Sequence, residues 1–246
     1  MNVKTIVAIG GGELRLNETF AIDKYIVNLS GKKTPKALSI LTASGEPEGY
    51  IETFNRVYGV ELGCETDTLK ILTEAVSDAI IRDKILCADI IYVGGGNTAK
   101  MITAWTSRNI GKYLTEAYNN GTILSGLSAG SICWFEHGHS DSFLDETGEH
   151  CIINGLGFIP GLHCPHYNDR PNFDEFMKTQ SKPALAIEDN CAIVFQNDCY
   201  KIIKANELSN AYLLENQNGA VKKRIIDNLD FKPINTLLRA DRGIVP

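Results

Sequence analysis

Residues 122–135 read TILSGLSAGSICWF, and this stretch decides the fold. An uncharged run, Thr122–Leu127, leads directly into Gly126-Leu127-Ser128-Ala129-Gly130, and a short helical segment, Ser131–Phe135, follows. A strand-to-helix turn of this G-x-S-x-G pattern holds its central residue in a strained conformation, and it needs small neighbours because strand and helix nearly touch. The stretch therefore predicts a buried strand that presents Ser128 at its carboxyl end as a candidate nucleophile.

Three further apolar runs also end in small-residue turns. They are Thr5–Ile9 before Gly10-Gly11-Gly12, Ala37–Thr42 before Ala43-Ser44-Gly45, and Asp89–Val93 before Gly94-Gly95-Gly96-Asn97. Nearly uncharged runs rich in β-branched residues are typical of strands buried on both faces of a parallel sheet. Segments with helical spacing lie around these runs: Glu48–Tyr58, Thr73–Leu86, Thr98–Thr106 and Asn109–Tyr118. This alternation predicts an α/β fold with a mostly parallel, doubly wound sheet flanked by helices.

The last third of the chain has a different pattern. Pro171–Thr179 is expected to form a helix with proline in its first turn. Short apolar runs with turn signals follow, and they predict antiparallel strands that extend or flank the sheet: Ala184–Ile187, Ala192–Phe195, Tyr200–Ile203, Ala211–Leu214 and Val221–Ile226. Because no linker, repeat or low-complexity stretch separates the two parts, we expect residues 1–246 to form a single domain.

The composition excludes several classes of protein. Of the 246 residues, 43% are apolar, and 24 basic residues against 30 acidic ones give a formal charge of −6. Such a chain, without a basic run, is not expected to bind nucleic acid or an anionic membrane surface. The long uncharged stretches 117–135 and 151–168 contain polar residues or proline, so neither is expected to cross a membrane. Seven scattered cysteines without a C-x-x-C pair predict free thiols and a cytoplasmic protein.

The glycine turn after Val93 is a second candidate for chemistry. Three successive glycines let backbone N–H groups approach a ligand closely. We expect the N–H groups of Gly96 and Ala129 to form an oxyanion hole beside Ser128. Asn97 and Thr98 would either contact the substrate or cap the helix that follows.

The turn Gly10-Gly11-Gly12 carries a weaker signal. It could belong to a dinucleotide loop, but the pattern G-x-G-x-x-G is absent. We therefore interpret it as a structural turn, and we expect neither a nucleotide nor any other cofactor.

A serine nucleophile needs a base, and all five histidines lie between positions 137 and 166. The segment Pro160–Tyr167 predicts a loop constrained by two prolines, which would hold His166 as the base and His163 in a structural role. In a rival interpretation the same region binds zinc or iron and the protein is a metal-dependent hydrolase. Its ligands would be His137, His139, Asp141, His150, His163 and His166. No rigid frame is evident for this set, so we expect no metal.

The base in turn needs a carboxylate to fix its tautomer. Asp141 and Asp145 follow the serine turn, whereas Glu188 and Asp189 directly follow the predicted strand Ala184–Ile187. The residues alone do not choose among these four acids.

Several of these motifs together resemble the S51 serine peptidases, the family of aspartyl dipeptidase and cyanophycinase. The matching pieces occur in the family's order: Tyr92-Val93-Gly94-Gly95-Gly96-Asn97-Thr98, Gly126-Leu127-Ser128-Ala129-Gly130-Ser131, Pro160-Gly161 leading to Pro165-His166-Tyr167, and Ala186-Ile187-Glu188-Asp189-Asn190-Cys191-Ala192. The resemblance implies a fold like that of class I glutamine amidotransferases, with serine where those enzymes carry cysteine.

The resemblance also implies roles for single residues. It makes Ser128 the nucleophile and His166 the base. The family's third member is a glutamate, and its place here falls on Asp189, one methylene shorter, with Glu188 adjacent and Asp141 as a further candidate. Aspartyl dipeptidases cleave dipeptides with an N-terminal aspartate, which requires a cation near the substrate carboxylate. Arg170 would supply that cation, and Asp141 would also line the substrate site.

These observations lead to two functional hypotheses, an enzyme and a non-catalytic protein. The main hypothesis is a serine peptidase, expected as a homodimer, that hydrolyses small peptides through an acyl-enzyme. The alternative, suggested by the shortened acid Asp189, is an amidotransferase-like fold that binds or regulates without catalysis.

Overall fold

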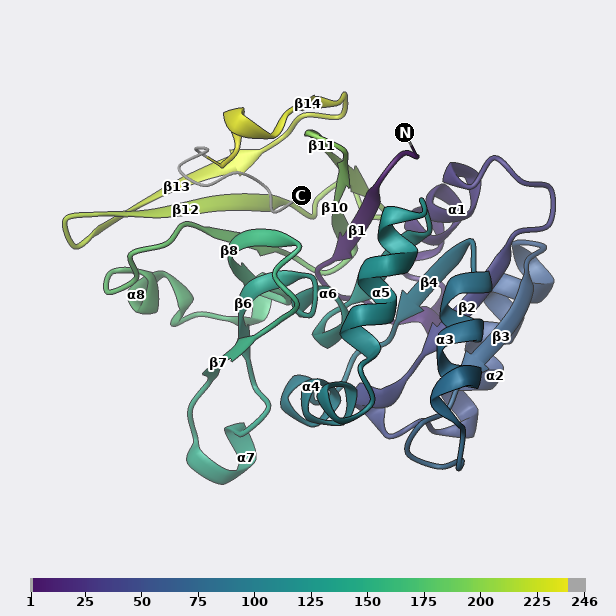
Figure 1. Cartoon of the computed structure of the whole chain (residues 1–246). Helices are drawn as coiled ribbons and strands as arrows, with labels where there is room; N and C mark the ends of the chain where they lie inside the picture. The colour runs from purple at the N-terminus through teal and green to yellow at the C-terminus, as the bar shows by residue number, and fades with distance from the viewer. Residues whose placement is uncertain (1, 239–246) are drawn as a thin grey trace.

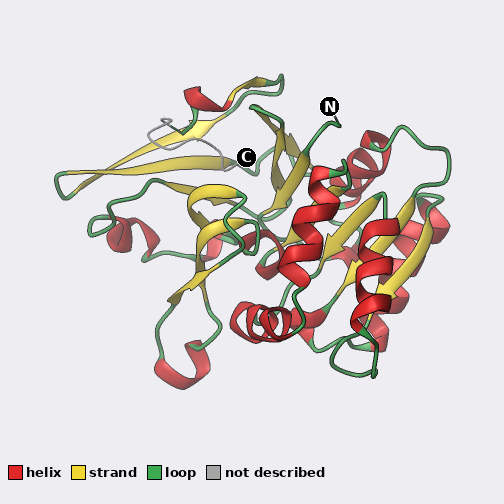
Figure 2. Ribbon diagram, viewed as in Figure 1, coloured by secondary structure: helices red, strands yellow, loops and turns green. Residues whose placement is uncertain are grey.

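The structure is a computed structural model, and it describes residues 2–238 apart from the side chains of Asp145 and Thr147. The described chain forms two sheets, one of eight strands and one of six. In Figure 1 the larger sheet runs from β11 to β3, and β6, β8 and β12 of the smaller sheet lie to its left. Figure 2 shows that most of the helical segments surround the larger sheet.

The larger sheet has the strand order β14-β11-β10-β1-β5-β4-β2-β3. Its strands β1 to β5 are parallel, whereas β10, β11 and β14 run antiparallel on one side. The bounds are β1 (Thr5–Ile9), β2 (Lys36–Ile40), β3 (Glu65–Leu69), β4 (Ile90–Val93), β5 (Ile123–Leu127), β10 (Cys191–Gln196), β11 (Cys199–Lys204) and β14 (Lys232–Pro233). The predicted parallel α/β sheet with antiparallel C-terminal strands is therefore confirmed.

Helices cover both faces of this sheet. Along β1, Ile6 and Ala8 belong to one hydrophobic core, and Val7 and Ile9 belong to the other. This alternation is the two-residue period of a strand buried on both sides. The helices α3 (Asp78–Cys87), α4 (Thr98–Ser107) and α5 (Ile110–Asn119) pack into the first core, and α1 (Phe20–Leu29) and α2 (Glu48–Phe54) pack into the second.

The smaller sheet has the strand order β13-β12-β9-β8-β6-β7. Its strands are β6 (Phe135–Ser140), β7 (Cys151–Asn154), β8 (Ile159–Cys164), β9 (Ala184–Ile187), β12 (Ala211–Gln217) and β13 (Ala220–Ile226). The short helices α6 (Ala129–Ile132), α7 (Leu144–Thr147) and α8 (Phe173–Met177) belong to the same part of the chain. Because β9 ends just before β10 begins, the two sheets are joined where the chain passes from one to the other.

Some local predictions were wrong. The segment predicted as a loop, Pro160–Tyr167, is strand β8 as far as Cys164. The helix expected over Ser131–Phe135 ends at Ile132, because Phe135 already pairs with Ile159 of β8. The helix expected from Thr73 begins only at Asp78, where Ser77 caps it by accepting a hydrogen bond from the Ile80 N–H.

None of the helices within residues 2–238 is long and apolar enough to cross a membrane.

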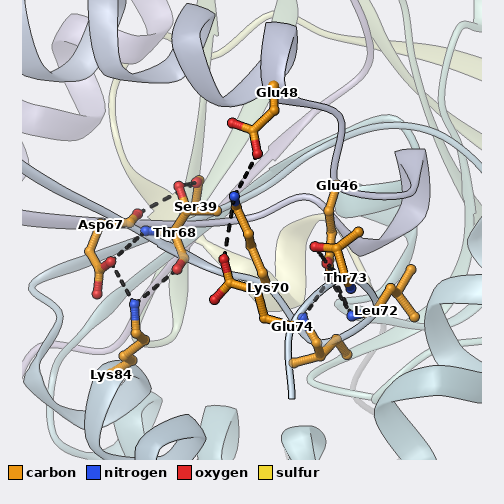
Figure 3. Close-up of polar contacts among 11 residues, drawn as sticks. Ser39, Glu46, Glu48, Asp67, Thr68, Lys70, Leu72, Thr73, Glu74 and Lys84 are labelled. Atoms are coloured by element: carbon orange, nitrogen blue, oxygen red, sulfur yellow. Dashed lines mark hydrogen bonds and ion pairs between the residues drawn. The ribbon is translucent and has the colours of Figure 1, made fainter. Parts of the chain in front are cut away.

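A polar pocket of about 320 Å³ lies along the edge strand β3, away from β5 in the strand order. Figure 3 shows two of its lysines: Lys70 binds Glu48 at 2.7 Å, and Lys84 binds Asp67 at 2.7 Å. Both cations are thus paired within the protein, and the pocket is not next to Ser128.

A buried carboxylate in α1 generates a prediction about stability. Asp23 is completely buried and accepts hydrogen bonds from the hydroxyls of Thr19 and Tyr58, each at 2.8 Å. Burial raises the pKa of Asp23 from 3.8 to about 6 in spite of these two bonds. The unfolded chain therefore loses this proton near pH 4, whereas the folded chain keeps it to about pH 6.

We expect this group to lower the free energy of unfolding by about 2–3 kcal/mol as the pH rises from about 4 to 7. Asp23→Asn cannot ionise and should lack that part of the decline. Urea unfolding of both proteins across this pH range measures the difference. Parallel curves for the two proteins would contradict the assignment.

Candidate active site

The turn between β5 and α6 presents Ser128 in a strained conformation. Its φ of 57° and ψ of −116° lie outside the regions that L-residues favour. A Cβ added to Gly126 would overlap the backbone of Gly130, and one added to Gly130 would overlap the carbonyl of Val93. Only glycine fits at these two positions, as the G-x-S-x-G pattern predicts, and Ser128 itself is half-buried.

The end of β1 ties three distant segments together. The carbonyls of Ile9, Gly10 and Gly11 accept hydrogen bonds from successive parts of the chain. Their donors are the N–H groups of Ser128 at 3.1 Å, His166 at 3.1 Å and Asn190 at 3.0 Å. The turn that we interpreted as structural is structural, but it also lies at the centre of the candidate site.

His166 and Asp189 form a directly bonded pair. Nδ1 of His166 lies 2.6 Å from Oδ1 of Asp189. This hydrogen bond lowers the pKa of Asp189, outweighing burial, and a second bond from Asn168 acts in the same direction. Because an ionised carboxylate only accepts hydrogen bonds, Nδ1 of His166 carries a proton and donates it to Asp189.

Asn168 holds the carboxylate in place from the other side. Its Nδ2 donates to Oδ2 of Asp189 at 3.0 Å, and its Oδ1 accepts from the Asp189 N–H at 2.9 Å. Asn168 was not among the predicted site residues, because it lies one residue beyond the matched segment that ends at Tyr167. Its amide fixes both the backbone and the side chain of Asp189.

The other candidate acids are engaged elsewhere. Glu188 accepts hydrogen bonds from the Asn210 N–H at 2.7 Å and the Tyr212 hydroxyl at 3.2 Å, which directs it towards β12. Asp141 forms an ion pair with Arg170 at 3.1 Å. The side chain of Asp145 lies outside the described residues. Of the three described candidates, only Asp189 contacts the base.

The backbone segments of Ser128 and His166 are both hydrogen-bonded to the end of β1, but their side chains are not hydrogen-bonded to each other. No hydrogen bond within residues 2–238 joins the Ser128 hydroxyl to the imidazole. Catalytic hydrogen bonds are often long before substrate binds and tighten only in the complex. A reaction through this pair would therefore require the two side chains to come together when substrate binds.

The glycine turn that follows β4 comes close to Ser128. A Cβ placed on Gly95 would lie 3.4 Å from Cβ of Ser128, so this glycine turn runs directly beside the serine. Gly96 has a φ of +133°, and a Cβ there would overlap the backbone of Ala43. Within the described chain, the N–H groups of Gly96 and Ala129 donate to no carbonyl. Ala129 is the first residue of α6, where helical N–H groups have no partner within the helix.

Asn97 and Thr98, predicted either to contact the substrate or to cap the helix, are hydrogen-bonded within the protein. Oδ1 of Asn97 accepts from the Lys100 N–H at 2.9 Å, and its Nδ2 donates to the Ser142 carbonyl at 2.8 Å. Thr98 is buried, and its hydroxyl accepts a 3.3 Å hydrogen bond from Ser140. The capping alternative therefore holds for Asn97, and both residues anchor the glycine turn to the end of β6.

Arg170 is a nearly buried cation four residues after His166. Its side chain is only 10% exposed and pairs with Asp141 through Nη2, whereas its Nε is buried and has no hydrogen-bond partner among the described residues. The ring of His139 stacks on that of His150, and Nε2 of His150 is also buried without a partner in the described part of the chain. Burial lowers the pKa of His139 to about 4, with His150 and Arg170 acting in the same direction.

The five histidines do not converge. His137 contacts Asn154 and Lys182 on the surface, His163 lies inside β8, and His166 binds Asp189. The part of the chain that the structure describes contains no group of three or more side chains placed to hold a metal ion. The metal-hydrolase alternative therefore lacks a ligand set among those residues.

Gly11 generates a prediction about the histidine–aspartate pair. A Cβ on Gly11 would overlap Oδ1 of Asp189 and the ring of His166, both at the ends of side chains that can move. Gly11→Ala should therefore separate the pair without unfolding the protein. The proton of a short histidine–aspartate hydrogen bond resonates far downfield in NMR spectra, and we expect this signal to disappear in the variant.

Gly49→Ala is a matched control, because a Cβ at Gly49 would meet no atom within 4 Å. Its spectrum should equal that of the unchanged protein. An unchanged downfield signal in Gly11→Ala would contradict the packing described for this glycine.

Comparison with known proteins finds related peptidases. The model of peptidase family S51 matches residues 6–203. The uncharacterized peptidase YgaJ of Bacillus subtilis (strain 168) is 32% identical over 217 residues, covering 85% of this chain and 91% of that protein. The uncharacterized peptidase PM1590 of Pasteurella multocida (strain Pm70) is 21% identical over 206 residues, covering 79% of this chain and 98% of that protein.

Two crystal structures have a similar fold. A peptidase from an acI-B1 actinobacterium gives a TM-score of 0.70 at 20% identity and covers 94% of this chain and 97% of its own. A Listeria monocytogenes EGD-e protein assigned to peptidase E gives a TM-score of 0.61 at 20% identity. The match covers 82% of this chain and 98% of that chain. On the family match over most of its length, this chain belongs to peptidase family S51.

Proposed function

We propose that this protein is a serine peptidase that hydrolyses small peptides through Ser128, His166 and Asp189. One observation carries the proposal: the His166–Asp189 pair at 2.6 Å and a serine in a strained strand-to-helix turn are held together by hydrogen bonds to three successive carbonyls, which begin at the last residue of β1. Membership of a peptidase family agrees with this chemistry.

In the proposed reaction, Nε2 of His166 takes the hydroxyl proton of Ser128 while Oγ bonds to the substrate carbonyl carbon. The carbonyl electrons move onto its oxygen, which the N–H groups of Gly96 and Ala129 stabilise. His166 then gives its proton to the leaving amine as the peptide C–N bond breaks. Water, activated by the same imidazole, hydrolyses the acyl-enzyme, and Asp189 stabilises the charged ring in both steps.

We propose a substrate with a carboxylate near the cleaved bond, as in a dipeptide with N-terminal aspartate. Arg170 supports this proposal because its guanidinium is nearly buried and its Nε has no partner in the structure. A buried, unpaired N–H donor favours binding of an anion. Asp141 already neutralises part of this charge, so a substrate carboxylate would share Arg170 with it.

We also propose that the protein works in the cytoplasm. All seven cysteines are free in the structure, and four of them are buried. This arrangement suits a reducing compartment.

The nucleophile is tested by Ser128→Ala. The variant should lose hydrolysis of Asp-Leu to the background rate and should not react with a fluorophosphonate, whereas its melting temperature should change little. Turnover by the variant at the rate of the unchanged protein would exclude Ser128 as the nucleophile.

An unchanged protein that is folded but neither reacts with the fluorophosphonate nor hydrolyses any dipeptide would contradict the proposal. That result would favour the non-catalytic binding module.

Specificity is tested by Arg170→Met, which keeps most of the side-chain volume but removes the charge. Hydrogen bonds to charged groups contribute about 1.5–3 kcal/mol, so kcat/KM for Asp-Leu should fall about 10- to 100-fold. The value for Ala-Leu should change much less. Arg82→Met is the control, because Arg82 is an exposed residue that pairs with Glu116. Equal losses on both dipeptides would contradict a carboxylate-binding role for Arg170.

A further inference from the structure

His163 is buried in β8 and binds two different elements. Its Nδ1 lies 2.9 Å from the Leu185 carbonyl on β9, its Nε2 lies 2.7 Å from the Ser131 hydroxyl in α6, and its ring stacks on Phe135. Because a carbonyl only accepts, Nδ1 carries the ring proton. Burial lowers the pKa of His163 to about 4, so the ring is neutral and Nε2 accepts a hydrogen bond from Ser131.

Ser131 connects this imidazole to the backbone of the candidate nucleophile. The Ser131 hydroxyl oxygen lies 2.7 Å from the carbonyl oxygen of Ser128. Its single proton is therefore shared, in a three-centre hydrogen bond, between the Ser128 carbonyl oxygen and Nε2 of His163. The same carbonyl accepts the N–H groups of Ser131 at 2.9 Å and Ile132 at 3.0 Å. The carbonyl of Ser128 is thus fixed from three sides.

The direction of that carbonyl determines the direction of an N–H group. The Ser128 carbonyl and the Ala129 N–H belong to one planar trans peptide unit, in which they point in opposite directions. Fixing the carbonyl therefore also fixes the Ala129 N–H, which we propose as an oxyanion donor. It also hinders relaxation of the strained ψ angle of Ser128, −116°.

We infer that His163 is a positioning residue: through Ser131 it fixes the peptide unit between Ser128 and Ala129 and so aims one donor of the oxyanion hole. This inference rests on the proposed function and adds to it. It also explains how β8 and β9 of the smaller sheet reach the nucleophile turn at the end of the larger one. Neither His163 nor Ser131 contacts the substrate in this account.

The test compares two buried serines. Ser131→Ala removes the hydroxyl between His163 and the Ser128 carbonyl. Ser125→Ala is the matched control, because Ser125 is equally buried and its hydroxyl donates to the Ile91 carbonyl at 2.9 Å. Both variants lose one buried hydroxyl, so the melting temperature should fall in both. A misplacement of about 1 Å can cost 10²-fold in rate.

We therefore expect kcat for Asp-Leu to fall about 10- to 100-fold in Ser131→Ala, with KM nearly unchanged, and to stay close to the original value in Ser125→Ala. The rate of fluorophosphonate labelling should fall in parallel with kcat. Equal kcat values for the two variants would overturn the inference, because the loss would then follow from packing alone.

Two substitutions of His163 distinguish its contact with Leu185 from its contact with Ser131. The amide of asparagine can take the place of Nδ1 and bind Leu185, whereas the longer glutamine can take the place of Nε2 and reach Ser131. His163→Asn should lower kcat as Ser131→Ala does, and His163→Gln should recover most of the loss. The double variant Ser131→Ala/His163→Asn should be no slower than the slower single variant, because both changes break one connection. Additive losses would contradict this connection.

The outcomes distinguish the inference from the proposed function. If the unchanged protein neither hydrolyses dipeptides nor reacts at Ser128, the proposed function fails and the inference fails with it. If the unchanged protein is active but Ser131→Ala keeps its kcat, only the inference fails. Should the His163 variants not fold, the comparison of Ser131→Ala with Ser125→Ala decides alone.

Discussion

The carbonyls of Ile9, Gly10 and Gly11 accept hydrogen bonds from Ser128, His166 and Asn190, and the rest of the candidate site depends on these three contacts. Each contact satisfies a backbone donor that would otherwise lose a hydrogen bond, so it restricts where its segment can lie. The glycines allow the close approach, because a side chain at Gly10 would overlap the backbone at Ile187 and Glu188. The end of β1 therefore sets the spacing between the segments that carry Ser128, His166 and Asp189.

Each sheet contributes a different part of the site. The larger sheet supplies Ser128 at the end of β5 and the glycine turn at the end of β4, whereas the smaller sheet supplies His166 just after β8 and Asp189 just after β9. In addition, His163 of the smaller sheet contacts the turn around Ser128 through Ser131. In this account the smaller sheet provides the base and acid and also holds the oxyanion donor in position.

The sequence predicts the elements with strong local patterns. Strands β1 and β9 have the predicted bounds, and the glycines around Ser128 have the close contacts that their pattern requires. Strand β3, Glu65–Leu69, was missed because it is a half-exposed edge strand that contains Glu65 and Asp67. Strand β8 was taken for a loop because its proline, glycine and histidine disfavour strands, and pairing with β6 and β9 overrides that tendency. Predictions from local pattern therefore fail where tertiary pairing decides.

Within the site, side-chain direction was the part that the sequence could not provide. Glu188 and Asp189 are neighbours, and which of them meets His166 depends on Asn210 and Tyr212, which engage Glu188. Likewise, the contact of Gly11 with His166 and Asp189 joins positions more than 150 residues apart.

The central claim, that β1 assembles a serine nucleophile with its base and oxyanion hole, is tested most directly by a crystal structure of the protein after reaction with a fluorophosphonate. We expect phosphorus bonded to Oγ of Ser128, its free oxygen within hydrogen-bond distance of the N–H groups of Gly96 and Ala129, and Nε2 of His166 turned towards the adduct. Phosphorus on another residue, or a free oxygen directed away from both N–H groups, would contradict it.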